Sequence, residues 1–185
     1  MELIAGHQVT EANSVDNFII DGHVRFFYGR DNNDLWKLLP ELLYAEPLQS
    51  LKNAPVEEKK AFMAEHKIDF VDLIKVLDGV PREEAANYED EFIDQYTDHP
   101  DAWFDVKGLI QSTPSIKAVY LTRKTFNTKV KNMRQQAKEL KDFCSRSGIR
   151  CAGLITPSRM YRDMNHKRNK WRETLQGDLT EFTGI

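Results

Sequence analysis

The sequence predicts an α/β protein, and one βαβ unit near its C-terminus carries most of that prediction. Residues 116–121 (IKAVYL) and 149–155 (IRCAGLI) are short runs rich in β-formers, as in buried strands. Between them, residues 127–146 have helical spacing and end at Ser147-Gly148, a helix stop signal. The apolar positions of this helix are Val130, Met133, Ala137, Leu140 and Cys144. A strand, a helix and a strand in this order predict parallel pairing.

The first elements of the chain are a short strand, a polar stretch and a helix. Residues 3–5 form the first apolar run and end in a loop at Gly6. An apolar and aromatic segment at 18–28 follows a polar stretch. Asn32 or Asn33 can cap a helix that runs to Leu43.

The middle of the chain predicts a second helix, from Pro55 to about His66, because Pro and acidic residues favour the first helical turn. Residues 68–73 are then either a strand or a loop. A helix-like acidic segment covers 81–94, and a short helix closes at Ile110.

The chain ends with a turn, Thr156-Pro157-Ser158, and a basic helix to about Leu175. We find no repeat, low-complexity tract or linker, so we expect one domain over residues 1–185.

The net charge of −3 hides a strong asymmetry along the chain. Residues 1–116 carry 10 Lys and Arg against 23 Asp and Glu, a balance of −13. Residues 117–172 carry 16 against 3, a balance of +13, and the last 13 residues add −3. A basic third of this kind predicts a polyanionic partner.

Several classes of protein are excluded by composition and motif. No apolar run reaches the roughly 18 residues of a membrane helix, and the N-terminus does not resemble a secretory signal. The two cysteines, Cys144 and Cys151, lack metal-binding spacing, so we expect free thiols in a reducing cytoplasm. Glycine-rich phosphate motifs, a nucleophile elbow and a zinc-protease motif are all missing from the sequence.

Ligands of open parallel sheets bind beyond the carboxyl ends of the strands, where this sequence has three loops. These are 6–8 (GHQ), 122–124 (TRK) and 156–159 (TPSR). The segment 159–172 then holds six Lys and Arg in 14 residues, with Tyr161 and Trp171 between them. Bases interleaved with aromatics favour phosphate binding, and a solvated helix face is the alternative.

Four segments, in order, carry a resemblance to a known family. They are FFYGRDNNDLW, which contains Asn33, Leu35 and Trp36, then HKIDFVDLI, SIKAVYLTRKTF and LITPSRMYR. This ordered set, spread over residues 3–175, resembles the uracil-DNA glycosylase superfamily, in particular its mismatch-type branch.

The resemblance implies a three-layer sandwich, with a central, mainly parallel four-stranded sheet flanked by helices. It implies a monofunctional DNA glycosylase, which flips a base out of DNA and hydrolyses its N-glycosidic bond without metal or cofactor. DNA is then the partner of a cytoplasmic monomer, from a prokaryote or a phage. The bases of 117–172 would face DNA, and the acids of the first 116 residues would cover mostly the opposite surface.

The first strand-end loop departs from the family pattern. The sequence has Gly6-His7-Gln8-Val9, with Gln8 where the family carries a water-activating Asp or Asn before Pro. Glutamine can position water but cannot take its proton, so Asn13, Asp16 or Asp21 could supply that group. The candidate catalytic residues are His7, Gln8, Asp16 and Asn33, and an inactive DNA-binding relative stays open.

The base-reading position departs as well. The segment IDFVDLI offers Asp72, or Asp69, where the uracil enzymes carry Asn. A carboxylate only accepts hydrogen bonds, which suits the exocyclic amine of cytosine better than uracil. We therefore expect a modified cytosine of phage DNA as target, in antiviral defence. Excision of uracil or mismatched bases in repair is the alternative, as is a structural role of Asp72.

The remaining candidates contact the base or the backbone. Phe27 and Tyr28 would stack on the flipped base. The residues expected to bind phosphate are Thr156, Ser158, Arg159, Arg162, Lys167 and Arg168. An unrelated competing hypothesis is a nucleotide-binding or interaction domain whose acidic segment 83–105 docks a basic partner.

Overall fold

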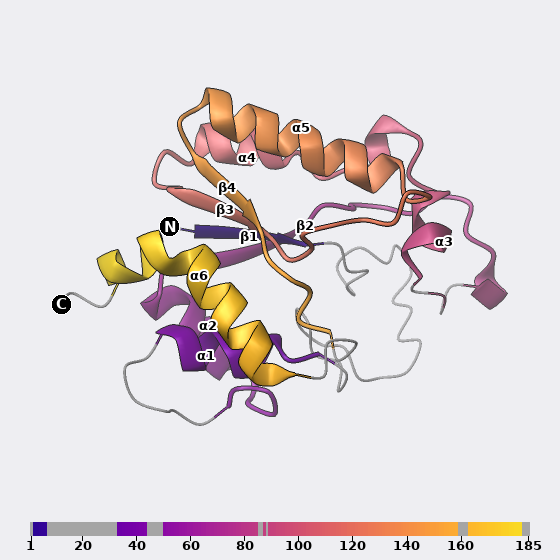
Figure 1. Ribbon diagram of the computed structural model, residues 1–185. Coiled ribbons are helices and arrows are strands. Elements are labelled where there is room, and N and C mark those ends of the chain that lie inside the picture. Colours follow the sequence, from indigo (N-terminus) through magenta and orange to yellow (C-terminus); the bar gives the residue numbers. More distant parts are fainter. Residues whose placement is uncertain are drawn as a thin grey trace.

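A four-stranded parallel sheet forms the centre of the molecule (Figure 1). The computed structural model describes residues 2–6, 33–43, 50–84, 87, 89–158 and 163–182. The strands are β1 (Glu2–Gly6), β2 (Ile68–Asp72), β3 (Ala118–Leu121) and β4 (Arg150–Gly153), in the order β2-β1-β3-β4. All three pairings are parallel, which confirms the prediction for the βαβ unit.

Helices cover both faces of this sheet (Figure 1). One face carries α4 (Val106–Ser112) and α5 (Asn132–Arg146). The other carries α1 (Leu35–Leu43), α2 (Val56–Glu65) and α6 (Met164–Phe182). The short α3 (Asp90–Asp94) lies beyond the sheet, and the segments Arg82–Glu84 and Pro100–Ala102 are single 3₁₀ turns. The predicted α/β class is therefore confirmed.

Strand β3 separates two apolar cores. All four of its residues are buried, and because successive side chains point to opposite faces, they divide between the two layers. Ala118 and Tyr120 pack with α1, α2 and α6, whereas Val119 and Leu121 pack with α4 and α5. The near-continuous apolar run of this strand is what a parallel strand covered on both faces requires.

The helices α1 and α2 begin close to their predicted caps. The side-chain oxygen Oδ1 of Asn33 accepts a 2.9 Å hydrogen bond from the backbone N–H of Leu35, at the start of α1. Pro55 is the N-cap of α2, and Glu57 and Glu58 lie in its first turn. Residues 68–72, left open between strand and loop, form β2.

Helix α5 begins five residues later than its pattern predicts. The carboxylate of Asp94 is 5% exposed and accepts hydrogen bonds from the backbone N–H groups of Lys131, Asn132 and Met133, at 2.7, 3.0 and 2.7 Å. These are donors that a helix leaves unpaired at its N-terminus, so this distant acid sets the start of α5. The helix ends as predicted, since Gly148 adopts a positive φ of 68° just beyond it.

The expected acidic helix over 81–94 is wrong in its extent. Among the residues described there, a 3₁₀ turn at Arg82–Glu84 and the five-residue α3 are helical, whereas Asn87 and Glu89 are not. Helix α6, in contrast, continues past the predicted end at Leu175 to Phe182.

Candidate functional site

The carboxyl ends of the four strands form one edge of the sheet, where the sequence places its candidate loops. Gly6, at the end of β1, is in register with Asp72, at the end of β2. The N–H of Leu154, just after β4, donates to the carbonyl of Leu121, the last residue of β3, at 2.7 Å. A Cβ atom on Gly153 would lie 2.9 Å from the Cα of Lys124, so this close approach requires glycine.

The start of α1 lies against the Thr156-Pro157-Ser158 turn. Asn33 and Ser158 form an antiparallel bridge, and the N–H of Asp34 donates to the carbonyl of Pro157 at 2.9 Å. The hydroxyl Oγ1 of Thr156 accepts a hydrogen bond from the N–H of Ser158 at 3.3 Å. Three predicted site residues, Asn33, Thr156 and Ser158, are thereby brought together from two distant segments.

A buried ion pair between α6 and the start of α1 stabilises the contact between α1 and the Thr156-Pro157-Ser158 turn. Nζ of Lys167, in the first turn of α6, lies 2.6 Å from Oδ2 of Asp34. The Lys167 side chain is fully buried, and that of Asp34 is 7% exposed. The predicted phosphate contact by Lys167 is therefore wrong, because its ammonium group is enclosed and already neutralised by Asp34.

Arg168 is also engaged within the protein. Its Nε and NH2 atoms bond Oε2 of Glu41 at 2.7 and 2.6 Å, and its NH1 bonds the side chain of Asn165 at 2.8 Å. All three guanidinium nitrogens thus have partners on α1 or α6. Arg168 therefore joins two helices, while its side chain stays 29% exposed, and its phosphate contact remains a prediction.

Trp171 plays a structural part beside these pairs. It is fully buried, and its Nε1–H donates to the carbonyl of Ile155 at 2.8 Å. The linker after β4 is therefore held by α6 at Ile155 and by α1 at Pro157. Trp171, which the sequence pattern grouped with phosphate-binding basic residues, is therefore a core residue.

Asp72 and Asp69 differ in ways that the sequence did not reveal. Asp69 is exposed and pairs in register with Leu3, about 10 Å before the end of β2 at 3.3 Å per residue. Asp72 is 7% exposed and lies at the strand end, beside Gly6. Of the two candidates, only Asp72 is adjacent to the loop that begins with His7.

Asp72 is the last residue of one edge strand, β2, and the Thr156-Pro157-Ser158 turn comes after the other edge strand, β4. Two strands lie between β2 and β4, and neighbouring strands are about 4.8 Å apart. The ends of β2 and β4 are therefore roughly 14 Å apart across β1 and β3.

Several predicted site residues lie outside the described part of the chain. They are His7, Gln8, Asn13, Asp16, Asp21, Phe27, Tyr28, Arg159 and Arg162. Their roles remain predictions from the sequence.

The acidic and basic segments are not kept on opposite surfaces. Arg123, after β3, forms an ion pair with Asp90 of α3 and lies over the Phe126 ring, 5.7 Å from its centroid. Lys129 pairs with Glu91 of the same helix at 3.2 Å. The expected separation of charge is therefore wrong here, because α3 neutralises the loop between β3 and α5.

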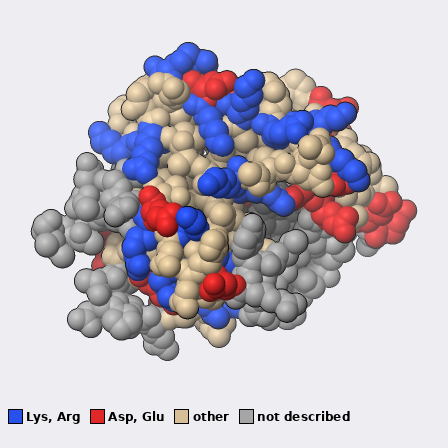
Figure 2. All heavy atoms as spheres, viewed as in Figure 1, with Lys and Arg blue, Asp and Glu red and all other residues tan. Residues whose placement is uncertain are grey.

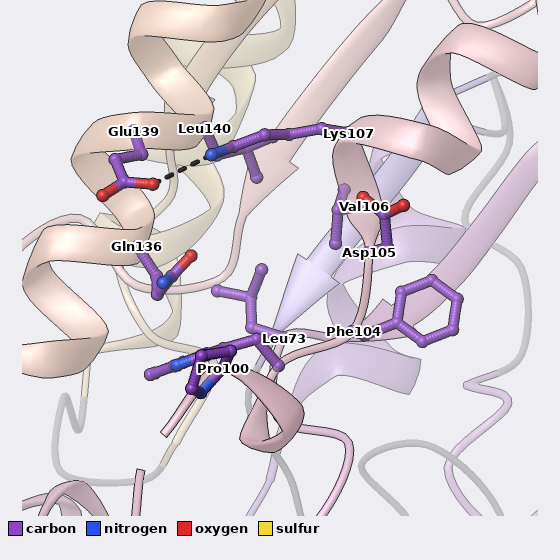
Figure 3. A pocket seen from close by; sticks show the side chains of 10 residues that line it. Leu73, Pro100, Phe104, Asp105, Val106, Lys107, Gln136, Glu139 and Leu140 are labelled. Carbon is purple, nitrogen blue, oxygen red and sulfur yellow. Dashed lines mark hydrogen bonds and ion pairs between the residues drawn. The ribbon is translucent and has the colours of Figure 1, made fainter. Parts of the chain in front are cut away.

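A cavity of about 260 Å³ opens between α4 and α5, near the end of β2 (Figure 3). Its lining includes Leu73, Val106 and Leu140, and Lys107 and Glu139 reach toward each other across it, 2.9 Å apart. None of the predicted site residues lines this cavity, and no sequence motif pointed to it.

The two cysteines are free thiols, as predicted. Cys144 is buried on α5, and Cys151 is half-buried on β4 in the same core cluster. A hydrogen bond between the thiols, together with burial, raises the pKa of Cys151, and the same bond lowers the pKa of Cys144.

The described ranges contain no group of three or more His, Cys, Asp or Glu side chains able to hold a metal ion. Among the helices that the structure describes, none combines the length and apolar composition that a bilayer crossing requires.

Comparison with protein-family models, with curated proteins and with solved structures finds no match to this chain.

Proposed function

We propose that this protein is a monofunctional DNA N-glycosylase, whose target is a modified cytosine. The observation that carries the proposal is the bridge between Asn33 and Ser158. It joins two of the segments on which the family resemblance rests, at the carboxyl edge of a parallel sheet, where such folds bind ligands.

The proposed reaction is hydrolysis of the bond between C1′ of the sugar and the ring nitrogen of the base. Water adds to C1′ and loses a proton, the base departs with the bonding electrons and takes up a proton, and an abasic site with a hydroxyl at C1′ remains. The sugar becomes cation-like and the base anionic in the transition state, so fixed hydrogen-bond donors and nearby phosphates supply most of the catalysis.

The candidate residues take distinct roles in this reaction. Asn33 uses its Oδ1 to cap α1, and its NH₂ group bonds no residue in the described ranges. That group can therefore donate to a departing base or to a held water. Thr156 and Ser158 would contact the backbone phosphate beside the target nucleotide, and His7, Gln8 or Asp16 would hold the attacking water.

The choice of cytosine rests on Asp72. A carboxylate accepts hydrogen bonds, and the exocyclic amine of cytosine donates them, whereas uracil presents a carbonyl oxygen at the same position. The low exposure of Asp72 favours such reading, because hydrogen bonds shielded from water discriminate more strongly. A base excision enzyme for uracil or mismatches is the alternative with the same chemistry.

The experiment is a glycosylase assay on duplex oligonucleotides with a single uracil, hypoxanthine, cytosine or 5-substituted cytosine, followed by alkaline cleavage at abasic sites. We expect cleavage only with the 5-substituted cytosine, and loss of it in Gln8→Ala or Asn33→Ala. Cleavage of uracil alone would overturn the choice of target. Cleavage of none of them, with retained DNA binding, would indicate an inactive relative.

A further inference from the structure

Helix α5 carries a line of basic side chains that the sequence analysis did not single out. Lys131, its N-cap, is followed by Arg134, Lys138 and Lys141, at spacings of three, four and three residues. Residues three and four apart on a helix are neighbours, so the four form one surface, here called the α5 basic face. Three of them are exposed and Lys141 is half-exposed.

The four basic side chains of this face have no ion-pair partner, unlike several basic side chains elsewhere in the described chain. Arg123, Lys129, Lys167, Arg168 and Lys170 all form ion pairs with acidic side chains. None of the four bases of the α5 basic face forms an ion pair with any described residue.

The acids on α5 leave most of this face positive. Glu139 turns toward α4 and pairs with Lys107, so Asp142 is the one acid beside the four bases on this helix. Figure 2 shows Lys and Arg predominating over the part of the surface formed by α5. Since these charges are not neutralised within the described protein, they remain available to an external polyanion.

The dimensions of the face suit a nucleic-acid backbone. From Lys131 to Lys141 the helix rises about 15 Å, at 1.5 Å per residue. One DNA strand presents a phosphate about every 3.4 Å along the duplex axis, so several phosphates lie within reach of the four bases. Lys131, the first of the four, lies at the N-terminus of α5, which the chain reaches through the loop that begins at the carboxyl end of β3.

We propose that the α5 basic face binds the sugar–phosphate backbone of duplex DNA that flanks the target nucleotide. The identification of the polyanion as DNA rests on the proposed function. The binding itself is argued from four basic side chains on one helix that have no ion-pair partner in the described chain. It is independent of which nucleobase is excised.

The test is binding of the full-length protein to an unmodified duplex at salt concentrations of about 50 to 200 mM. The variant Lys131→Gln/Arg134→Gln/Lys138→Gln removes three charges from the face. The matched control, Lys60→Gln/Lys67→Gln/Lys117→Gln, removes three from exposed positions elsewhere, with the same change in net charge. The slope of log affinity against log salt should become shallower by about 3 in the first variant, at about 0.9 per lost phosphate contact, and stay unchanged in the control.

Equal slopes for the two triple variants would overturn the proposal, as would the absence of salt-dependent binding by the unaltered protein. The same preparations are assayed for base excision. Binding that depends on the α5 basic face without any excision would support this inference and contradict the proposed function. Base excision together with equal salt slopes for the two triple variants would support the proposed function and contradict DNA binding by the α5 basic face.

Discussion

Asp34 and Lys167 lie 133 positions apart in the sequence and 2.6 Å apart in the structure, and both side chains are buried. Moving two charged groups out of water costs free energy, and in this pair the attraction between the two charges offsets that cost. It joins the start of α1 to the start of α6. Since Asp34 also donates its N–H to Pro157, the pair positions the turn that contains Thr156 and Ser158.

Breaking the pair from one side should destabilise the protein strongly. We expect Lys167→Met to lower the free energy of unfolding by about 3–5 kcal/mol, because it leaves the Asp34 carboxylate buried without a partner. Urea unfolding followed by circular dichroism measures this loss.

The control is Lys170→Met on the same helix, which breaks the exposed pair with Glu173 at 2.7 Å. That change should cost at most about 1 kcal/mol. The double change Asp34→Leu/Lys167→Met should recover much of the stability. If Lys167→Met and Lys170→Met lowered the free energy of unfolding by similar amounts, the stabilising role of the buried Asp34–Lys167 pair would be contradicted.

Asp94 should stabilise the folded protein by capping the N-terminus of α5. In Asp94→Ala, three backbone N–H groups lose their acceptor, so we expect a loss of about 2 kcal/mol or more in the free energy of unfolding. The exposed Asp98→Ala serves as control and should change stability by less than about 0.5 kcal/mol. Hydrogen exchange of the first turn of α5 should rise only in Asp94→Ala.

His66 should make stability depend on pH. Burial lowers the pKa of His66, partly offset by Glu65, and its ring lies 4.6 Å from that of Phe62. The unfolded chain therefore takes up a proton at higher pH than the folded one. Stability contributed by neutral His66 is present above pH 6.5 and is lost as pH falls below it.

Melting temperatures between pH 7.5 and 5 test this dependence. The fall in melting temperature should be smaller in His66→Gln, whereas the exposed His166→Gln should behave like the unaltered protein. An identical fall in all three proteins would exclude His66 as its source.

Asp72 should decide which base is accepted. An amide can both donate and accept, so Asp72→Asn is expected to lose excision of the modified cytosine and to gain excision of uracil. Asp69→Asn, on the same strand but exposed, should keep the original preference. Unchanged preference in a folded Asp72→Asn protein would assign this carboxylate a structural role.

The sequence predicts well those elements whose apolar pattern follows from burial of the element's own residues. The run at 116–121 and the apolar spacing from Met133 to Cys144 reflect burial on both faces of a sheet and on one face of a helix. The start of α5 could not be predicted in this way, because Asp94 caps it from 37 residues away.

The candidate site was harder to predict for the same reason. The basic pattern after Ser158 indicates positive charge but not the acids that meet it in the fold. Lys167 and Arg168 find Asp34 and Glu41 on α1, whereas the bases of α5 find no acidic partner in the described chain. Ion pairs between distant segments leave no periodic signal in a sequence.

The most direct test of the proposed function is abasic-site formation by the purified protein in duplex DNA that contains one 5-substituted cytosine. We predict alkali-labile cleavage at that position, lost in Asn33→Ala and absent from an otherwise identical duplex with unmodified cytosine. Intact DNA after prolonged incubation with a folded, DNA-binding protein would contradict glycosylase activity on this base.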